Sequence, residues 1–120
     1  MELKSLNADY QSGQQIYWTG RKSNPDLGKQ YWNQEIELID LHQIKNENTI
    51  DIALLGYVCD EGVRRNLGRI GAAKGPKMIR ERLAKLLIHF DEKRVVDAGD
   101  IICIEEDIES CQQVFTNTIF

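Results

Sequence analysis

Arginine, asparagine and glycine residues crowd one short stretch of the sequence, residues 56–75, and their chemistry suits an anion. Arg64, Arg65 and Arg69 carry planar guanidinium groups, which can bind a carboxylate or phosphate through two parallel hydrogen bonds. Asn66 adds a neutral amide donor. Glycines in the same stretch allow sharp turns and a close approach of the backbone to a ligand. This composition is typical of a loop that binds carboxylate or phosphate groups.

Charge patterning leaves a structural interpretation of these arginines open. Residues 64–85 hold eight basic residues and one acid, whereas residues 97–109 hold six acids and no base. The two blocks can meet across a fold or can meet partners, and charge counting does not decide between these outcomes. The loop arginines can therefore pair with Glu61, Asp97 or Asp100 and only hold the loop. A nucleotide cradle is disfavoured, because neither G-x-x-x-x-G-K-[ST] nor G-x-G-x-x-G occurs.

The remaining candidates for chemistry are few, and no catalytic residue or metal ligand is predicted among them. Asp97 and Asp100 are three residues apart, and paired carboxylates can bind a metal or share a proton. In isolation, Asp-Ala-Gly-Asp is more typical of a turn at a strand end, so a structural role is favoured. His42 and His89 are the only histidines, and neither lies at metal-ligand spacing.

The elements that would position the loop form a βαβα pattern. Residues 50–57 (IDIALLGY) are short and almost wholly apolar, as in a strand covered on both faces. Gly75-Pro76 predicts the start of a helix over 76–90. A second strand is expected over 95–104, interrupted at 97–100, and a second helix starts near Glu105. One apolar stripe at helical spacing lies on the first helix. It is formed by Ile79, Leu83, Leu86 and Phe90 and widened by Met78 and Leu87.

This pattern predicts an α/β fold with a parallel sheet, in which residues 50–57 and 95–104 are adjacent parallel strands with a right-handed connection. The candidate loop then leaves the carboxyl end of a strand, where α/β proteins bind ligands. Residues 1–49 are expected to form an arm, irregular over 1–30, while 31–41 fit a helix or a strand, with helix preferred. Residues 50–120 form the βαβα unit. Two strands cannot make a sheet buried on both faces, so we expect a truncated single domain.

Composition excludes several classes of protein. The chain has 120 residues, a net charge of −4 and a pI of about 5.2. No apolar run approaches the roughly 18 residues of a membrane helix, and the acidic pI argues against a nucleic-acid partner. Three cysteines fit a reducing, cytoplasmic location. Cys103 and Cys111 are expected in the core, and Cys59 is expected to be the accessible thiol.

The run from Gly56 to Arg80 resembles the first strand, loop and helix of the ureohydrolases, which include arginase, agmatinase and formimidoylglutamase. The Gly-Pro-x-x-[Ile/Leu]-Arg element at 75–80 is shared widely in that family. The narrower D-E-G-V-R-R-N-x-G-R stretch at 60–69 resembles formimidoylglutamase, and so does Trp-Thr-Gly-Arg at 18–21. Y-W-N-Q at 31–34 and V-D-A-G-D at 96–100 also fit, so the resemblance covers about residues 16–115.

The resemblance implies an arginase-like three-layer α/β/α sandwich that is truncated here after the second strand and its following helix. It implies hydrolysis of N-formimidoyl-L-glutamate to L-glutamate and formamide, in histidine degradation, at two manganese ions. The family binds these ions through Gly-Gly-Gly-His, Asp-Ala-His-x-Asp and Asp-x-Asp elements, and none occurs in this sequence. The chain alone is therefore expected to bind no metal and to be inactive, as the N-terminal portion of the enzyme.

Within that resemblance, the loop is expected to bind the acidic end of a small-molecule substrate. Arg69 and Asn66 are the preferred substrate-binding residues, and Arg64 and Arg65 are weaker candidates. An agmatinase- or arginase-like activity is the alternative within the family, although a cationic substrate does not suit an arginine-rich loop. A small anion- or phosphate-binding module that uses residues 64–85 is the alternative outside it. No membrane or nucleic-acid partner is expected, and a homo-oligomer is left open.

Overall fold

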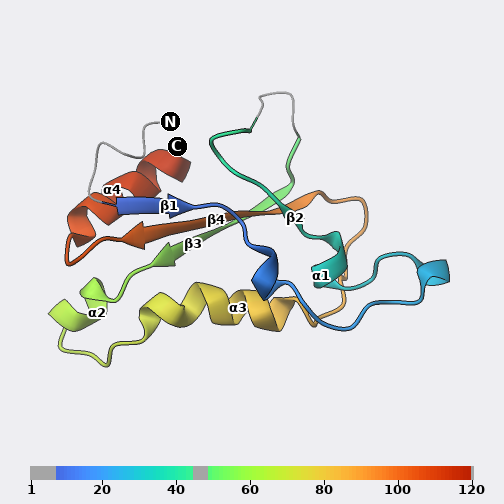
Figure 1. Cartoon of the computed structure of the whole chain (residues 1–120), viewed down its shortest axis with the longest axis horizontal. Helices are drawn as coiled ribbons and strands as arrows, with labels where there is room; N and C mark the ends of the chain where they lie inside the picture. Colours follow the sequence, from blue (N-terminus) through green and yellow to red (C-terminus); the bar gives the residue numbers. More distant parts are fainter. Residues whose placement is uncertain (1–7, 45–48, 120) are drawn as a thin grey trace.

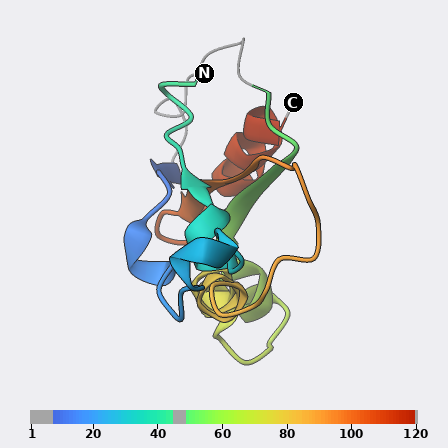
Figure 2. The ribbon, with the colours of Figure 1, turned by 90° about the vertical axis from the view of Figure 1, so that its right-hand side faces the viewer.

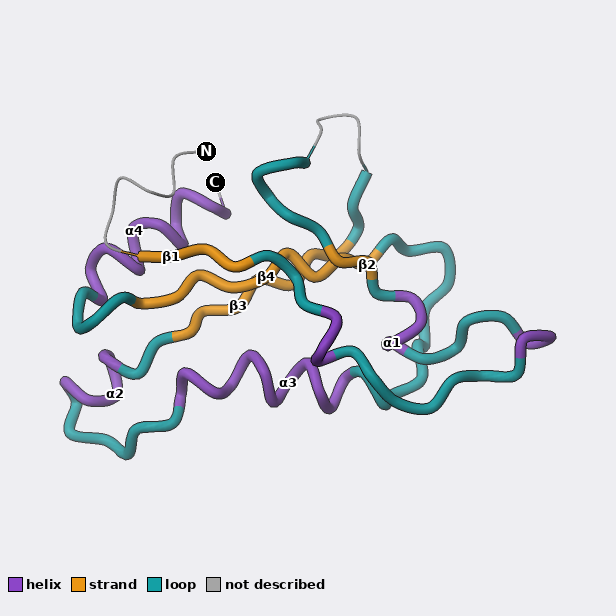
Figure 3. Tube along the Cα trace, viewed as in Figure 1, coloured by secondary structure: helices purple, strands orange, loops and turns teal. Residues whose placement is uncertain are grey.

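The computed structural model describes residues 8–44 and 49–119, which form one small sheet with helices around it (Figure 1). The sheet contains four strands, β1 (Ala8–Gln11), β2 (Glu37–Leu38), β3 (Ile52–Val58) and β4 (Val95–Cys103). The α-helices are α1 (Trp32–Glu35), α2 (Glu61–Arg65), α3 (Gly75–Leu83) and α4 (Ile108–Ile119). Short 3-10 turns complete the described structure, η1 (Gln15–Tyr17), η2 (Pro25–Leu27) and η3 (Ala72–Lys74) (Figure 3).

Strand β4 is the centre of the sheet. β3 runs parallel to β4 along one side, so the predicted pair of adjacent parallel strands is confirmed. On the other side, β2 pairs in parallel with Val96 and Asp97, and β1 pairs antiparallel with residues 100–103. The predicted parallel sheet is therefore only partly parallel, and the prediction of an irregular arm is wrong over 8–11. The arm contributes an edge strand because β4 extends past β2 and leaves backbone groups for β1 to pair with.

Strand β4 continues through residues 97–100, where the sequence predicted an interruption. Leu54 pairs with Asp97 and Gly56 with Asp100, so β4 holds one extra residue in a β-bulge. Gly99 lies in this bulge with φ of +94°, and a Cβ there would stand 1.9 Å from the carbonyl oxygen of Gln11. A glycine is therefore required for the strand to bend here without breaking.

Helix α3 ends at Leu83, seven residues before the predicted end at Phe90. The carbonyl oxygens of Ala84 and Leu86 accept hydrogen bonds from the backbone N–H groups of Asn33 and Trp32, and the Asn33 side chain also donates to Ala84. The chain leaves the helix through a turn at Ala84 and Lys85, and these partners bind the carbonyl groups that a longer helix would use itself. The apolar stripe is partly exposed in the described chain, since Met78 and Ile79 are 50% and 61% exposed.

Helix α4 begins at Ile108, three residues later than predicted. The carboxylate of Asp107 accepts hydrogen bonds from the backbone N–H and hydroxyl of Ser110, as an N-cap does. Glu105 has a φ of +55°, which is incompatible with a helix start. Cys111 and Val114 of α4 pack on Ile101 of β4 and form the buried core. Figures 1 and 2 show α3 and α4 on opposite faces of the sheet.

The ambiguous segment 31–41 contains both predicted elements, since the short helix α1 is followed directly by strand β2. The candidate loop is also more ordered than expected, because α2 and η3 lie within it. The fold is therefore α/β with a mixed sheet. Within the residues that the structure describes, none of the helices combines the length and apolar character that crossing a bilayer requires.

Candidate functional site

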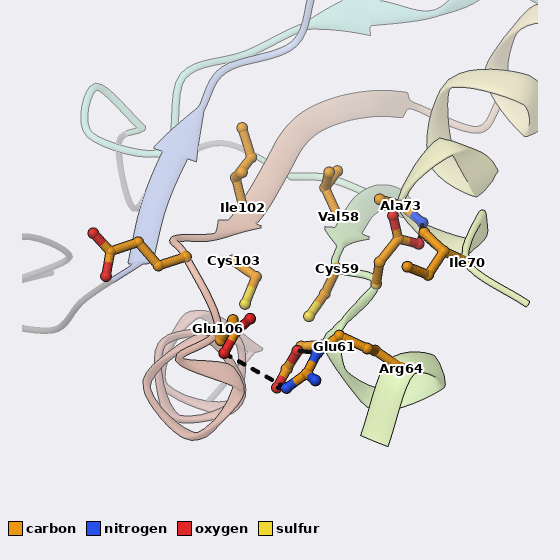
Figure 4. Close-up of a pocket in the computed structure, with 11 residues that line it drawn as sticks. Val58, Cys59, Glu61, Arg64, Ile70, Ala73, Ile102, Cys103 and Glu106 are labelled. Carbon is orange, nitrogen blue, oxygen red and sulfur yellow. Dashed lines mark hydrogen bonds and ion pairs between the residues drawn. The ribbon is translucent and has the colours of Figure 1, made fainter. Parts of the chain in front are cut away.

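The candidate site lies where β3 and β4 end at the same edge of the sheet (Figure 4). Residues 59–74 leave the end of β3, and residues 104–107 leave the end of β4. Between these segments is a cavity of about 340 Å³. Its lining is contributed by Val58, Cys59, Asp60, Glu61, Arg64, Ile70, Ala73, Ile102, Cys103, Glu105 and Glu106. The site therefore occupies the edge that the sequence predicted.

A buried carboxylate organises the first part of the loop. The Glu61 side chain is only 4% exposed, and its two oxygens accept hydrogen bonds from Arg64 Nε at 2.5 Å and Arg65 Nε at 2.7 Å. The hydrogen bond from Arg64 is the main cause that lowers the pKa of Glu61 from 4.5 to about 2, against the opposing effect of burial. Glu61 is therefore ionised at neutral pH and holds both arginines.

The same two arginines join α2 to the segment that begins α4. Arg65 binds Glu109 at 2.5 Å and donates to the carbonyl oxygen of Glu106 at 3.0 Å. Arg64 lies 3.6 Å from the Glu106 carboxylate. Hydrogen bonding with Glu109 and then Glu61 raises the pKa of Arg65. The basic and acidic blocks of the sequence therefore meet across the fold, and these arginines have the structural partners that the alternative interpretation expected.

Asn66 and Arg69 differ from Arg64 and Arg65, because their side chains have no partner in the described chain. Both are exposed, and the structure gives neither side chain a hydrogen bond or ion pair within residues 8–44 and 49–119. Asn66 also lines a second cavity of about 520 Å³, together with Tyr57 and Gly62. Of the four predicted substrate-binding residues, the two preferred ones thus present free donors at the strand-end edge.

Asp60 closes the loop that carries these donors. Its Oδ1 atom accepts hydrogen bonds from the backbone N–H groups of Gly71 at 3.0 Å and Ala73 at 2.8 Å. Asp60 follows β3 directly, whereas Gly71 and Ala73 lie just before α3. One carboxylate oxygen therefore brings the two ends of the 60–73 segment together and fixes the base from which Asn66 and Arg69 project. The sequence analysis did not assign this role to Asp60.

A second charged centre lies on the face of the sheet that α3 covers. The Arg80 side chain is 4% exposed, and it donates to Asp100 Oδ1 at 2.7 Å, Asp97 Oδ1 at 3.0 Å and the Gly99 carbonyl oxygen at 2.7 Å. Its Nε atom lies 2.9 Å from Asp97 Oδ2, although this N–H is not aligned for a hydrogen bond. Burial alone lowers the pKa of Arg80, but Asp100 and Asp97 outweigh it and raise the pKa.

The arm completes this buried centre. The indole N–H of Trp18, a fully buried residue, donates to Asp97 Oδ2 at 2.8 Å, and the backbone N–H of Gly99 donates to Asp97 Oδ1. A Cβ at Gly56 would stand 1.8 Å from Asp100 Oδ1, so only glycine leaves room for that carboxylate. Asp97 and Asp100 are thus structural, as the sequence favoured, but their partner is Arg80 and not an arginine of the loop.

The three cysteines gather on the opposite face of the sheet, beneath α4. All are free thiols, and Cys59 is buried, so the prediction that it is accessible is wrong. Burial, and then hydrogen bonding with Cys59, raises the pKa of Cys103 to about 12. The hydroxyl of Tyr57 is buried without a hydrogen-bond partner in the described chain, beside Cys59 and Cys111, and burial raises its pKa. The sequence spacing gave no indication of this cluster.

No model of a known protein family matches the chain. Curated formimidoylglutamases, however, match most of it. The enzyme of Geobacillus kaustophilus is 42% identical over 106 residues, which are 86% of this chain and 33% of that protein. The enzyme of Lysinibacillus sphaericus is 36% identical over 106 residues, with 87% and 33% covered. The enzyme of Clostridium tetani is 35% identical over 119 residues, with 95% and 35% covered. By sequence the chain is similar to formimidoylglutamases over most of its length, and it spans about a third of the length of the curated relatives it matches.

Proposed function

We propose that this chain supplies the substrate-binding edge of an enzyme that hydrolyses N-formimidoyl-L-glutamate to L-glutamate and formamide, in the cytoplasmic degradation of histidine. The name of the relatives supports the substrate class. The observation that carries the proposal is the pair of exposed donors without partners, Asn66 and Arg69, at the carboxyl edge of β3 and β4. The substrate has two carboxylates, and these donors match their hydrogen-bonding needs.

Each part of the loop has its own task in this proposal. The Arg69 guanidinium binds a substrate carboxylate through two hydrogen bonds, and the Asn66 amide donates a third from beside it. Arg64 and Arg65 are not the proposed substrate contacts, because Glu61 and Glu109 already occupy several of their donors. They hold α2 against the start of α4. Asp60 fixes both ends of the loop, so that Arg69 keeps its position when no substrate is bound.

Two manganese ions are the proposed source of the attacking hydroxide, since a bound metal lowers the pKa of water. The described residues do not fit such a centre. They contain no group of three or more histidine, cysteine or acidic side chains placed to hold a metal ion. The only clustered carboxylates of β4, Asp97 and Asp100, are occupied by Arg80. We therefore assign no catalytic step to this chain, and we expect residues 1–120 alone to release no formamide when manganese is added.

The proposed fold of the complete enzyme is a three-layer α/β/α sandwich with a larger parallel sheet. Two features of the described residues support it. The outer edge of β3 has no strand partner among them. Next to it, Ala53, Leu54, Ile79 and Pro76 line an open cavity of about 430 Å³ between β3 and α3. An unpaired parallel edge beside apolar side chains is typical of a sheet that continues.

A chimera tests the proposed function. The matched segment of this chain replaces its counterpart in the Geobacillus kaustophilus relative, which supplies the other two thirds of the length. We expect manganese-dependent release of formamide from N-formimidoyl-L-glutamate. In the chimera, Arg69→Ala should lower kcat/KM about ten- to a hundred-fold, because a lost charge-assisted hydrogen bond costs about 1.5–3 kcal/mol.

Arg82→Ala is the matched control, because Arg82 is also exposed and has no side-chain partner in the described chain. This variant should keep the chimera's kcat/KM. If the Arg69 variant keeps kcat/KM but melts at a lower temperature, the residue belongs to the scaffold instead. A folded chimera with no activity would contradict the proposal that this segment serves a formimidoylglutamase.

A further inference from the structure

The thiols of Cys59 and Cys103 lie at matched positions on neighbouring strands, and the proposed function uses neither of them. Val58 of β3 pairs with Ile102 of β4 in a parallel register, so Cys59 and Cys103 occupy the next positions on the two neighbouring strands. Neighbouring strands lie about 4.8 Å apart, and side chains at matched positions point to the same face. Figure 4 shows the two cysteines next to each other on one side of the strands.

This placement meets the requirements of a disulfide bond. A disulfide joins residues whose Cα atoms are about 4.4–6.8 Å apart and whose side chains share a face, and matched positions on adjacent strands satisfy both. The third thiol differs, because Cys111 is on α4 and fully buried. Cys59 and Cys103 both line the open cavity of about 340 Å³ at the strand ends, whereas Cys111 is absent from its lining. Although Cys59 is buried, it keeps 8% exposure, whereas Cys111 has none, so a small oxidant in that cavity contacts the pair and not Cys111.

We propose that Cys59 and Cys103 form a reversible intramolecular disulfide bond in the presence of hydrogen peroxide, which makes the pair a redox modification site. One thiolate attacks the peroxide, so that an S–O bond forms, the O–O bond breaks and water leaves after protonation. The second thiolate attacks that sulfur, so that the S–S bond forms, the S–O bond breaks and a second water leaves. The two sulfurs lose two electrons, the peroxide gains them, and a dithiol reductant reverses the change.

The environment of the pair sets the conditions for this reaction. Burial raises the pKa of Cys103 to about 12, so its thiol is protonated at neutral pH and reacts slowly. The rate of disulfide formation should therefore rise as the pH is raised. The titratable and charged groups that face the pair come from β3, α2, α4 and the two loops, and they are Tyr57, Asp60, Glu61, Arg64, Glu105, Glu106 and Cys111.

The disulfide would join the two points from which the loops of the candidate site leave the sheet. Cys59 immediately precedes Asp60, which closes the loop that carries Arg69. Cys103 immediately precedes the turn whose Glu106 faces Arg64. A covalent bond at this position fixes the ends of β3 and β4 relative to each other, independently of what the loop binds.

Peptide mapping of the oxidised chain tests the proposal. The chain is treated with hydrogen peroxide at neutral and alkaline pH, unfolded, alkylated with iodoacetamide and digested without reduction. We expect a mass loss of two hydrogen atoms, one cross-linked peptide pair that contains Cys59 and Cys103, alkylated Cys111, and full reversal by dithiothreitol. The cross-link should form faster at alkaline pH, and the chain should remain a monomer on a non-reducing gel.

Variants separate the pair from the third thiol. Cys59→Ser and Cys103→Ser should each reduce the cross-link to background, while Cys111→Ala should keep it. Cys59→Ala and Cys103→Ala replace the serine variants if those lose the wild-type circular dichroism spectrum. A cross-link that contains Cys111, a cross-link between chains, or oxidation of single cysteines without any cross-link would each overturn the proposal.

Discussion

Arg80 and Arg69 belong to the same basic stretch, residues 64–85, but their surroundings in the structure are opposite. Arg80 is buried against two carboxylates and a carbonyl oxygen. Arg69 is exposed and has no side-chain partner in the described chain. The two differ in the element that carries them: Arg80 lies on the buried face of α3, opposite the β-bulge of β4, whereas Arg69 lies on the protruding part of the loop. Position relative to the sheet, and not residue type, separates the stabilising arginine from the binding candidate.

The comparison also explains why the two arginines need different surroundings. The Arg80 centre fixes α3 and the arm to β4 through Trp18 and Asp97. The loop donors need freedom from internal partners, because a guanidinium already paired with a carboxylate has fewer of its five N–H donors left for a substrate. Glu61 binds Arg64 and Arg65, so Arg69 and Asn66 are the loop donors that stay free to bind a substrate.

The largest expected effect on stability is that of replacing Arg80. Arg80→Ala leaves Asp97 and Asp100 as buried charges without their cation, and breaking a buried ion pair in this way costs about 3–5 kcal/mol. We expect the free energy of unfolding, measured by urea denaturation of the chain, to fall by that amount. Arg80→Lys should recover only part of it, because an ammonium cannot reach both carboxylates and the Gly99 carbonyl in the same geometry.

Arg69→Ala is the matched variant in the same denaturation experiment. It should leave the free energy of unfolding within about 0.5 kcal/mol of the wild type, as an exposed substitution without partners does. Equal losses for the two variants would remove the distinction between a stabilising and a binding arginine.

The sequence predicts the local elements well where a pattern needs no distant partner. The apolar run of β3, the Gly75-Pro76 start of α3 and the strand-end position of the loop are all confirmed. These features follow from periodicity and turn chemistry within a few residues of each site.

Features that depend on distant partners could not be predicted in this way. The polar segment of β1 shows no strand periodicity and becomes a strand only because β4 offers an open edge. Helix α3 stops early because Asn33, some fifty positions away, binds the carbonyl oxygen of Ala84. The pairing of Arg80 with Asp97 and Asp100 was hidden because charge counting gave eight basic residues no individual partners.

A smaller effect sharpens the comparison at the loop itself. Asp60→Ala removes the acceptor for the N–H groups of Gly71 and Ala73, and unsatisfied groups of this kind cost about 1–3 kcal/mol. Because water can reach the exposed N–H of Gly71, the loss of global stability should be nearer the net contribution of one hydrogen bond, about 0.5–1.5 kcal/mol. We expect faster proteolysis within residues 66–71, monitored by mass spectrometry. Asp60→Asn keeps an acceptor oxygen and should lose less. If cleavage in this segment is unchanged in the alanine variant, Asp60 does not hold the loop.

The smallest expected effect concerns Glu61, the carboxylate that binds Arg64 and Arg65 but not Arg69. The pKa of Glu61 is about 2 in the folded chain, below its ordinary value of 4.5, so the unfolded chain binds this proton more readily. The stability that Glu61 contributes is therefore fully present above about pH 4.5 and is lost as the pH falls towards 2. Glu61→Gln should lower the melting temperature at neutral pH and flatten its dependence on pH across that window, whereas the exposed Glu35→Gln control should leave the profile unchanged.

Glu61→Gln should also free the donors of Arg64 and Arg65, so in the chimera it is expected to weaken the preference for Arg69 as the substrate contact. An unaltered slope between pH 4.5 and 2 in the glutamine variant would show that Glu61 does not hold these arginines in solution.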